Sequence, residues 1–351
     1  MTTQHVSVTV NGDTKFEPAE TFQVSLSNPS NGAVLSDSSG QGTISNDDLS
    51  VKAFRIEMDG SQFPPTGSPA TGIGTFIYDP VAMAASYSIR IQGLDFGLAS
   101  GGAAQTPTTD DDVTGMHFHN APRGASGGVV FGQLHPEQDN DDLAIVMNAD
   151  GSWTVSGRWE TTDPASVSII NFAPMFDTAT LGADIPLYFN IHTTLFPVSI
   201  IRGQLVGLSD DNANVVNGTA GVDLLPGLGG DDTLNGLGGD DTLTGGFGND
   251  TIDGGNGIDT AVFAGLRSAY QINRAGGVTT VTGPDGTDSL TNVELLRFSD
   301  ITIGNDPTEP VAGSVSISDV TITEGNSGTK VATFTVTRTG GTLAFLSLIH
   351  I

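Results

Sequence analysis

A carboxylate recurs every nine residues across positions 209–262 of this 351-residue chain. The series consists of one Asn followed by five Asp: Asn214, Asp223, Asp232, Asp241, Asp250 and Asp259. A glycine stands two residues before most of them, at Gly221, Gly230, Gly239, Gly248 and Gly257. Calcium prefers about six to eight hard oxygen ligands, and carboxylates together with the carbonyls of glycine-rich turns can supply them. The spacing therefore predicts calcium binding by the five Asp residues and by Gly230, Gly239, Gly248 and Gly257.

The same period predicts how the residues are arranged. Glycines allow a tight turn, and the short segment after each acid places one apolar residue inward. Two repeats make one coil, so residues eighteen apart should stack, Asp223 over Asp241 and Asp232 over Asp250. Each stacked pair can then hold one calcium ion from two sides.

The charges of this segment predict that it folds only with calcium. Residues 208–259 contain ten Asp and no Lys, Arg or Glu. Two like charges ~4 Å apart repel by ~1 kcal/mol in water and by ~4 kcal/mol at an effective dielectric constant of 20. We therefore expect disorder without calcium and folding upon binding. The alternative is a flexible Gly/Asp-rich linker, but a linker has no reason to keep a nine-residue register over six units.

The run GGFGNDTID matches the RTX nonapeptide at every position. The residues that follow, from DTAVFAGLRSAYQINRAGG to NVELLRFSD, resemble the β cap of serralysin-type proteins. The resemblance implies a parallel β-roll with a β cap over residues 208–305. It also implies secretion by the type I route, in which the roll stays loose at low intracellular calcium and folds outside the cell.

Residues 51–206 form a β-rich unit that resembles a CHRD domain, through MHFHNAPRGASGGVVF, N-x-H-T and R-G-Q-L. His117 and His119 are two apart, which on a strand places both on one face, and His192 lies in a second strand. Zinc or copper sites need such an arrangement. Because buried histidines bonded to the backbone are commoner, we favour a structural role for all three. Asn190, Thr193 and Arg202 are expected to join a polar network at the strand ends.

Both ends of the chain resemble parts of Calx-beta domains. Residues 1–49 match the C-terminal half through GDT, LSNP and NDD, and residues 313–345 match the opening strands. The resemblance implies additional, weaker calcium ligands, namely Asp13, Glu17, Glu20, Asp47, Asp48 and Glu324. Residues 346–351, LSLIHI, read as an encoded sequencing adaptor, so we expect the chain to be a piece of a longer protein.

The overall composition limits the partners. Forty acidic against twelve basic residues give a net charge of -28, which disfavours nucleic acid and anionic membranes. The absence of Cys excludes disulfides and thiolate zinc sites. No apolar run approaches the about 18 residues of a transmembrane segment. The opening MTTQHVSVTV lacks the basic and then apolar pattern of a signal peptide, so we expect either another export route or a different N-terminus in the full protein.

We therefore expect an all-β chain, a string of β-sandwich modules plus the parallel β-roll. The expected function is calcium binding by a secreted or cell-surface, adhesin-like protein that is not itself an enzyme, with other extracellular proteins or glycans as partners. An alternative is the calcium-binding part of a secreted hydrolase, whose catalytic domain would lie elsewhere because neither H-E-x-x-H nor G-x-S-x-G occurs. A third hypothesis is a metalloenzyme or copper-handling module built on the three histidines.

Overall fold

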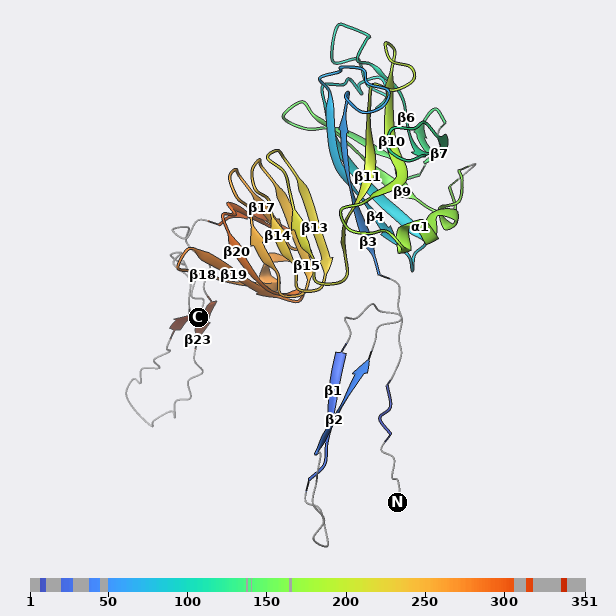
Figure 1. Ribbon diagram of the computed structural model, residues 1–351. Coiled ribbons are helices and arrows are strands. Elements are labelled where there is room, and N and C mark those ends of the chain that lie inside the picture. The colour runs from blue at the N-terminus through green and yellow to red at the C-terminus, as the bar shows by residue number, and fades with distance from the viewer. Residues whose placement is uncertain are drawn as a thin grey trace, which may run out of the picture.

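The structure is a computed structural model that confirms the all-β fold class (Figure 1). It describes residues 7–10, 20–27, 38–44, 50–136, 138–139, 141–163, 166–305, 314–317 and 336–339. Within these residues, no helix is long and apolar enough to cross a membrane. Two larger units are present, an antiparallel sandwich and a parallel roll.

The sandwich is one antiparallel sheet with the strand order β7-β6-β10-β11-β3-β4-β5-β9-β8. Its strands alternate buried and accessible side chains; in β5, for example, Ile89 and Ile91 are buried on either side of Arg90. The elements are β3 (Lys52–Asp59), β4 (Thr71–Asp79), β5 (Ala84–Gln92), β6 (Val113–Asn120), β7 (Gly128–Leu134), β8 (Ala144–Met147), β9 (Trp153–Trp159), η1 (Ile169–Phe172), α1 (Ala173–Asp177), β10 (Asp184–Thr193) and β11 (Ile201–Asp210).

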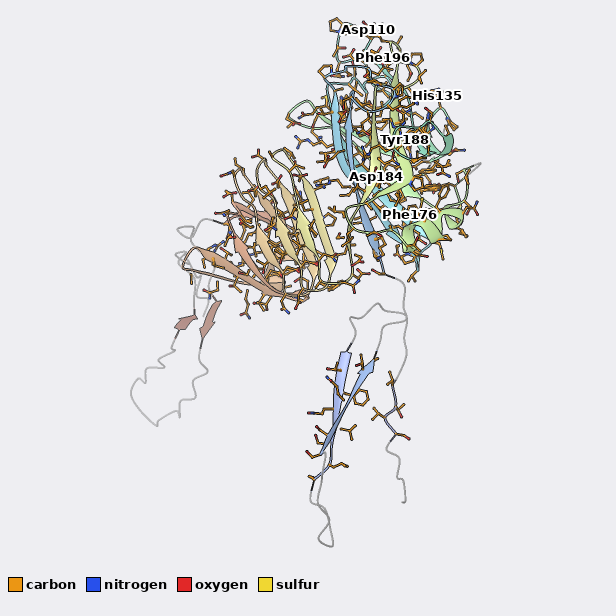
Figure 2. The ribbon with its side chains drawn as sticks, in the orientation of Figure 1. Asp110, His135, Phe176, Asp184, Tyr188 and Phe196 are labelled. Atoms are coloured by element: carbon orange, nitrogen blue, oxygen red, sulfur yellow. The ribbon has the colours of Figure 1, made fainter. Side chains whose placement is uncertain are left out.

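The sheet folds over on itself around an aromatic core. Phe76 of β4 lies 5.4 Å, between ring centroids, from Phe118 of β6, although three strands separate β4 and β6 in the sheet order. Phe131 of β7 likewise stacks on Trp159 of β9 at 5.2 Å. Phe176 of α1 closes one end of this core beneath the strands (Figure 2). Buried aromatic rings contribute most of the apolar area that stabilises such a core.

The roll consists of two parallel sheets whose strands pair eighteen residues apart. One contains β12 (Val215–Asn217), β14 (Thr233–Asn235) and β16 (Thr251–Asp253), and the other β13 (Leu224–Gly229), β15 (Thr242–Phe247) and β17 (Thr260–Val262). The aliphatic residue of each repeat points inward and is at most 1% exposed: Val216, Leu225, Leu234, Leu243, Ile252 and Ala261. The core of the coils is thus formed by two facing columns of apolar side chains, one from each sheet.

A β cap ends the roll. It comprises η2 (Arg267–Ala269), β18 (Gln271–Ala275), β19 (Val278–Gly283), β20 (Gly286–Thr291), β21 (Leu295–Arg297) and β22 (Thr302–Gly304). β20 pairs in parallel with β16, and β21 with β17, so both sheets continue into the cap. The cap then turns antiparallel through β19 and β22.

The sandwich closes the opposite end of the roll. Strand β11 passes through the expected domain boundary near residue 207, and its end contacts β13 (Figure 1). Ala53 of β3 and Leu208 of β11 are buried in the core cluster of the roll, and Ser209 Oγ donates to the Pro226 carbonyl at 2.6 Å. Because solenoids need covered ends, the sandwich serves as the N-terminal cap of the roll.

The flanking segments are described only in part. β1 (Glu20–Ser25) pairs with β2 (Ser39–Ile44), and β23 (Ser314–Ile317) pairs with β24 (Val336–Thr339), both antiparallel. The two hairpins are β structure, as expected for both ends, and the Calx-beta assignment stays a prediction.

We expect Leu208→Ala to lower the free energy of unfolding of the calcium-loaded roll by about 2 to 4 kcal/mol, because it opens a cavity beneath the first coil. Denaturant unfolding followed by far-UV circular dichroism would measure the loss. Fluorescence of the two Trp residues, Trp153 and Trp159, reports the sandwich separately.

Leu266→Ala is the matched control, because Leu266 is 56% exposed and its truncation should change stability by no more than about 0.5 kcal/mol. Equal effects of the two substitutions would contradict the capping role of the sandwich.

Candidate calcium ladders and a histidine cluster

Buried carboxylates line the roll in two columns. The Oδ1 atom of an Asp accepts a hydrogen bond from the backbone N–H eighteen residues earlier, at 2.7 Å for Asn214 to Asp232 and 2.8 Å for Asp223 to Asp241, Asp232 to Asp250 and Asp241 to Asp259. We call the column of Asn214, Asp232 and Asp250 the first ladder, and that of Asp223, Asp241 and Asp259 the second ladder. All five Asp side chains are at most 2% exposed.

The other carboxylate oxygen of the ladder residues is buried and unpartnered. Among the described residues, no hydrogen-bond donor reaches Oδ2 of Asp232, Asp241, Asp250 or Asp259, or Oδ1 of Asp223. A buried acceptor without a partner is costly, so each such oxygen needs an explanation.

A glycine five residues before Asp232, Asp241, Asp250 and Asp259 leaves room beside the unpartnered oxygen. A Cβ added at Gly227 would lie 2.4 Å from Asp232 Oδ2 and 2.3 Å from the Gly245 carbonyl oxygen. The corresponding distances at Gly236 are 2.5 Å to Asp241 Oδ2 and 2.3 Å to the Gly254 carbonyl oxygen. A carboxylate oxygen and a carbonyl oxygen that converge in this way form a donor set that calcium accepts.

These glycines were missed by the sequence analysis. They are Gly218, Gly227, Gly236, Gly245 and Gly254, and they keep the same period of nine, which would have identified them. The glycines that were predicted, Gly230, Gly239, Gly248 and Gly257, all have positive φ. A Cβ on Gly257 would meet the Gly239 carbonyl oxygen at 1.9 Å, so this second set keeps successive turns in close contact.

The cap extends both ladders. The Asp250 N–H donates to Asp288 Oδ1 at 3.0 Å, and the Asp259 N–H donates to Glu294 Oε2 at 2.8 Å. These pairs are 38 and 35 residues apart, so the regular period does not reveal them. The cap therefore contributes acids at the positions that a further coil would occupy.

Basic residues of the sandwich meet the opposite ends of the ladders. Lys52 Nζ forms an ion pair with Asp210 at 2.7 Å, and Asp210 Oδ1 accepts from Asn214 Nδ2. Arg55 lies 4.0 Å from Asp223 Oδ1 and donates to the Asn217 carbonyl. Side-chain cations thus face the carboxylates where the array begins.

Burial raises the pKa of carboxylates in both ladders. Desolvation, with the charge of Asp250 adding to it, raises the pKa of Asp232 to about 8. Desolvation also raises the pKa of Asp241 and of Asp288 to about 7, and it raises the pKa of Asp250 and Asp259. A cation or a proton must therefore offset these charges near neutral pH.

The three histidines of the sandwich come together. The potential ligand nitrogens of His117, His119 and His192 lie within 4.8 Å of one another, and the Nε2 atoms of His117 and His192 are 2.7 Å apart. Desolvation and the neighbouring imidazoles lower the pKa of His117 to about 3, and desolvation lowers those of His119 and His192. All three are therefore neutral near neutral pH.

Asn190 and Arg202, two of the three residues expected in a polar network, lie next to this cluster, whereas Thr193 Oγ1 accepts a hydrogen bond from the Phe196 N–H at 3.3 Å. Asn190 Oδ1 accepts from Ser199 Oγ at 2.6 Å, and Arg202 donates to the carbonyls of Phe63 and Ala125 at 2.9 Å each. Of the acids implied by the Calx-beta resemblance, Asp13, Glu17, Asp47, Asp48 and Glu324 lie outside the described residues. Glu20 begins β1.

Comparisons with known proteins agree with two of the resemblances. The CHRD domain family model matches residues 54–205, and that of the RTX calcium-binding nonapeptide repeat matches residues 209–241 and 226–261. No curated protein sequence matches the chain.

Two solved structures share limited similarity with the chain. One is the extracellular lipase LipA from Serratia marcescens, with 24% identity and a TM-score of 0.24, covering 25% of this chain and 14% of the lipase. The other is the AlgE6R3 subunit of the Azotobacter vinelandii mannuronan C5-epimerase, with 18% identity and a TM-score of 0.18, covering 34% of this chain and 93% of that subunit. The matched families show that the chain contains a CHRD domain followed by RTX calcium-binding nonapeptide repeats.

Proposed function

We propose that the roll binds calcium along both ladders and that this binding folds it outside the cell. The observation that carries the proposal is the unpartnered, buried Oδ2 atom beside a glycine carbonyl, repeated in successive coils. Asp232 with the Gly245 carbonyl, and Asp241 with the Gly254 carbonyl, would hold ions in the first and second ladders. The ion would supply the positive charge that the desolvated carboxylates lack.

Coupling between binding and folding follows from the size of the core. Each repeat buries one small aliphatic side chain, worth about 1.5 to 3 kcal/mol when fully buried. Five of the six repeats also bury a carboxylate of which one oxygen has no partner among the described residues. Without an ion, the cost of the buried acids opposes the small core, so the binding free energy becomes folding free energy.

In the intact protein, we propose that the roll is one rigid, calcium-dependent segment in a secreted or cell-surface string of β modules. The Calx-beta-like ends, residues 1–49 and 313–345, would continue that string. The role is adhesin-like and non-catalytic, with extracellular proteins or glycans as partners of the other modules. Low intracellular calcium would keep the roll unfolded during export, and the higher extracellular concentration would fold it.

Calcium should increase the far-UV β signal of the full chain after chelator treatment, and magnesium should not. Replacing Asp232 and Asp250 together with Asn should weaken calcium binding about tenfold or more, because it removes two charged ligands of one ladder. Asn keeps an oxygen for the Asn214 and Asp232 N–H groups, so the stacking hydrogen bonds can remain. Circular dichroism and calorimetric titration would measure both effects.

The matched control is Asp231→Asn with Asp240→Asn, which removes two charges from exposed positions of the same coils. The control should bind calcium nearly as the parent chain does. An unchanged spectrum from excess chelator to millimolar calcium would sink the proposal, as would equal weakening in both variants.

The space between Asp232 Oδ2 and the Gly245 carbonyl oxygen, which we call the cradle, can be tested with Gly227→Ala without changing any charge. Its Cβ would fill the space between Asp232 Oδ2 and the Gly245 carbonyl, and overpacking of this kind costs about 1 to 3 kcal/mol. Gly221→Ala is the control, because the nearest atom to a Cβ there is 3.8 Å away. We expect calcium titration to show weaker binding for Gly227→Ala alone; parity between the two variants would argue against the cradle.

The ion-free roll should gain stability as pH falls. In the folded state, desolvation raises the pKa of Asp232 to about 8 and that of Asp241 to about 7, from the ordinary value of 3.8. At pH values between the ordinary pKa of 3.8 and these raised values, the folded roll therefore binds more protons than the unfolded chain does. The stability that this provides is lost as the pH rises through the folded-state pKa values. Circular dichroism in metal-stripped buffer should show more β signal at about pH 5 than at about pH 8. A signal that instead grows with pH would contradict this sign.

A further inference from the structure

The imidazoles of His117, His119 and His192 converge on the face of β6 and β10 that is opposite the aromatic core, away from the calcium ladders. His117 and His119 lie two residues apart on β6, and β10 pairs with β6 so that His192 lies opposite Gly115 and Asn190 opposite His117. His117 and His119 are 7% and 9% exposed, and His192 is partly accessible. The antiparallel register alone therefore brings the third imidazole to the first two.

Hydrogen bonds direct the Nε2 atoms of two rings toward the centre of the cluster. His119 Nδ1 lies 2.9 Å from the Gly127 carbonyl, and His192 Nδ1 lies 3.0 Å from the Pro197 carbonyl. A carbonyl only accepts, so both Nδ1 atoms carry the proton and both Nε2 atoms present a lone pair. His119 Nε2 is buried and has no partner among the described residues.

The close contact between the His117 and His192 rings requires a proton or a cation between their Nε2 atoms. The Nε2 atoms of His117 and His192 are 2.7 Å apart, and two bare lone pairs would repel at that distance. In the ion-free protein, His117 Nε2 must therefore donate its hydrogen to His192. A metal ion can replace this proton once the two rings separate slightly, since nitrogens on a tetrahedral zinc ion lie about 3.3 Å apart.

Neighbouring side chains hold the rings in these orientations. His119 stacks in parallel on Tyr188 at 4.8 Å between centroids, and the Arg202 guanidinium lies 3.4 Å from the centroid of the same ring. Asn190 Nδ2 lies 3.4 Å from His192 Nε2 in the ion-free protein, a contact that a metal ion on Nε2 would replace, and Ser199 Oγ donates to the Asn190 amide oxygen. The contacts of the His119 and His192 Nδ1 atoms with backbone carbonyls are the outer contacts typical of metal-binding imidazoles.

We propose that His117, His119 and His192 form a binding site for a divalent transition metal that prefers imidazole, zinc or copper, ligated through the three Nε2 atoms. Within the described part of the chain the group offers three ligands, so one coordination position stays open to water or an external ligand. Closed structural zinc sites use four protein ligands, whereas three imidazoles with an open position are typical of reactive or ligand-exchanging sites.

This site belongs to the sandwich and uses nitrogen ligands, so it is independent of the proposed calcium function. Calcium prefers oxygen ligands, whereas zinc and copper accept imidazole nitrogens. Saturating calcium should therefore occupy the roll and leave the three histidines free. Loss of zinc or copper binding would therefore contradict only the histidine site, and loss of calcium binding would contradict only the calcium ladders.

The test uses the full chain, stripped of metal and returned to millimolar calcium. Zinc and copper are titrated separately, and bound metal is measured by equilibrium dialysis with elemental analysis. We expect one tight equivalent per chain, weakened about 100-fold or more in His119→Gln and in His192→Gln, since loss of even an outer contact costs about 10- to 100-fold. His135→Gln changes an exposed histidine, labelled in Figure 2, that does not belong to the group of three, and this variant should bind metal as the parent chain does.

Tryptophan fluorescence and near-UV circular dichroism show whether each variant keeps the sandwich folded. Independently of the variants, electron paramagnetic resonance of the parent chain with one copper equivalent should show nitrogen hyperfine coupling. The relative affinities of the zinc and copper arms identify the preferred ion. Binding at background in both arms, or equal binding by the parent chain and a folded His119→Gln, His192→Gln double variant, would overturn the proposal, as would a copper spectrum without nitrogen coupling.

Discussion

The buried carboxylate with one satisfied and one unsatisfied oxygen is the constraint on which the roll depends. Asp241 shows it in full: its Oδ1 receives the Asp223 N–H, and its Oδ2 lies beside the Gly254 carbonyl with no donor among the described residues. The first contact fixes the stacking distance between coils, and the second leaves a negative charge in a desolvated place. Ionised groups persist in such places only when they are paired or bind a metal. Replacing the acids with neutral residues would remove that conflict along with the cation site.

The buried acids and apolar residues at the two ends of the roll are covered by other parts of the chain, whereas those of the inner coils are covered by neighbouring coils. Inner coils have a neighbour on each side, whereas an end coil would expose both its apolar residues and its ladder acids. The cap continues the ladders with Asp288 and Glu294, and the sandwich brings Lys52 and Arg55 to the other end. Leu208 and Ala53 cover the apolar columns at that end. The sandwich and the cap therefore limit the calcium-dependent part of the chain to the coils between them.

Sequence reasoning was most effective where one interaction repeats. The period of nine placed Asp232 over Asp250 and turned Leu234 inward, because each repeat meets the same backbone geometry. It missed Asp288 and Glu294, since the cap returns to the ladders through antiparallel strands whose lengths no period records. The distance between His192 and His117 was equally hidden, because the pairing of β6 with β10 spans 75 residues and depends on packing of the whole sandwich.

The two proposed metal sites differ in how much of each exists before an ion arrives. Phe118, Trp159 and the surrounding rings give the sandwich an aromatic core that needs no calcium, so β6 and β10 hold their imidazoles in place beforehand. The ladder carboxylates come together only as the coils stack, so under the proposed function the same step that creates their sites would require the ion. A site formed in advance binds without ordering any chain, whereas the roll spends part of its calcium affinity on ordering about fifty residues. The sandwich should therefore respond to metal by occupancy alone, and the roll by a change of shape.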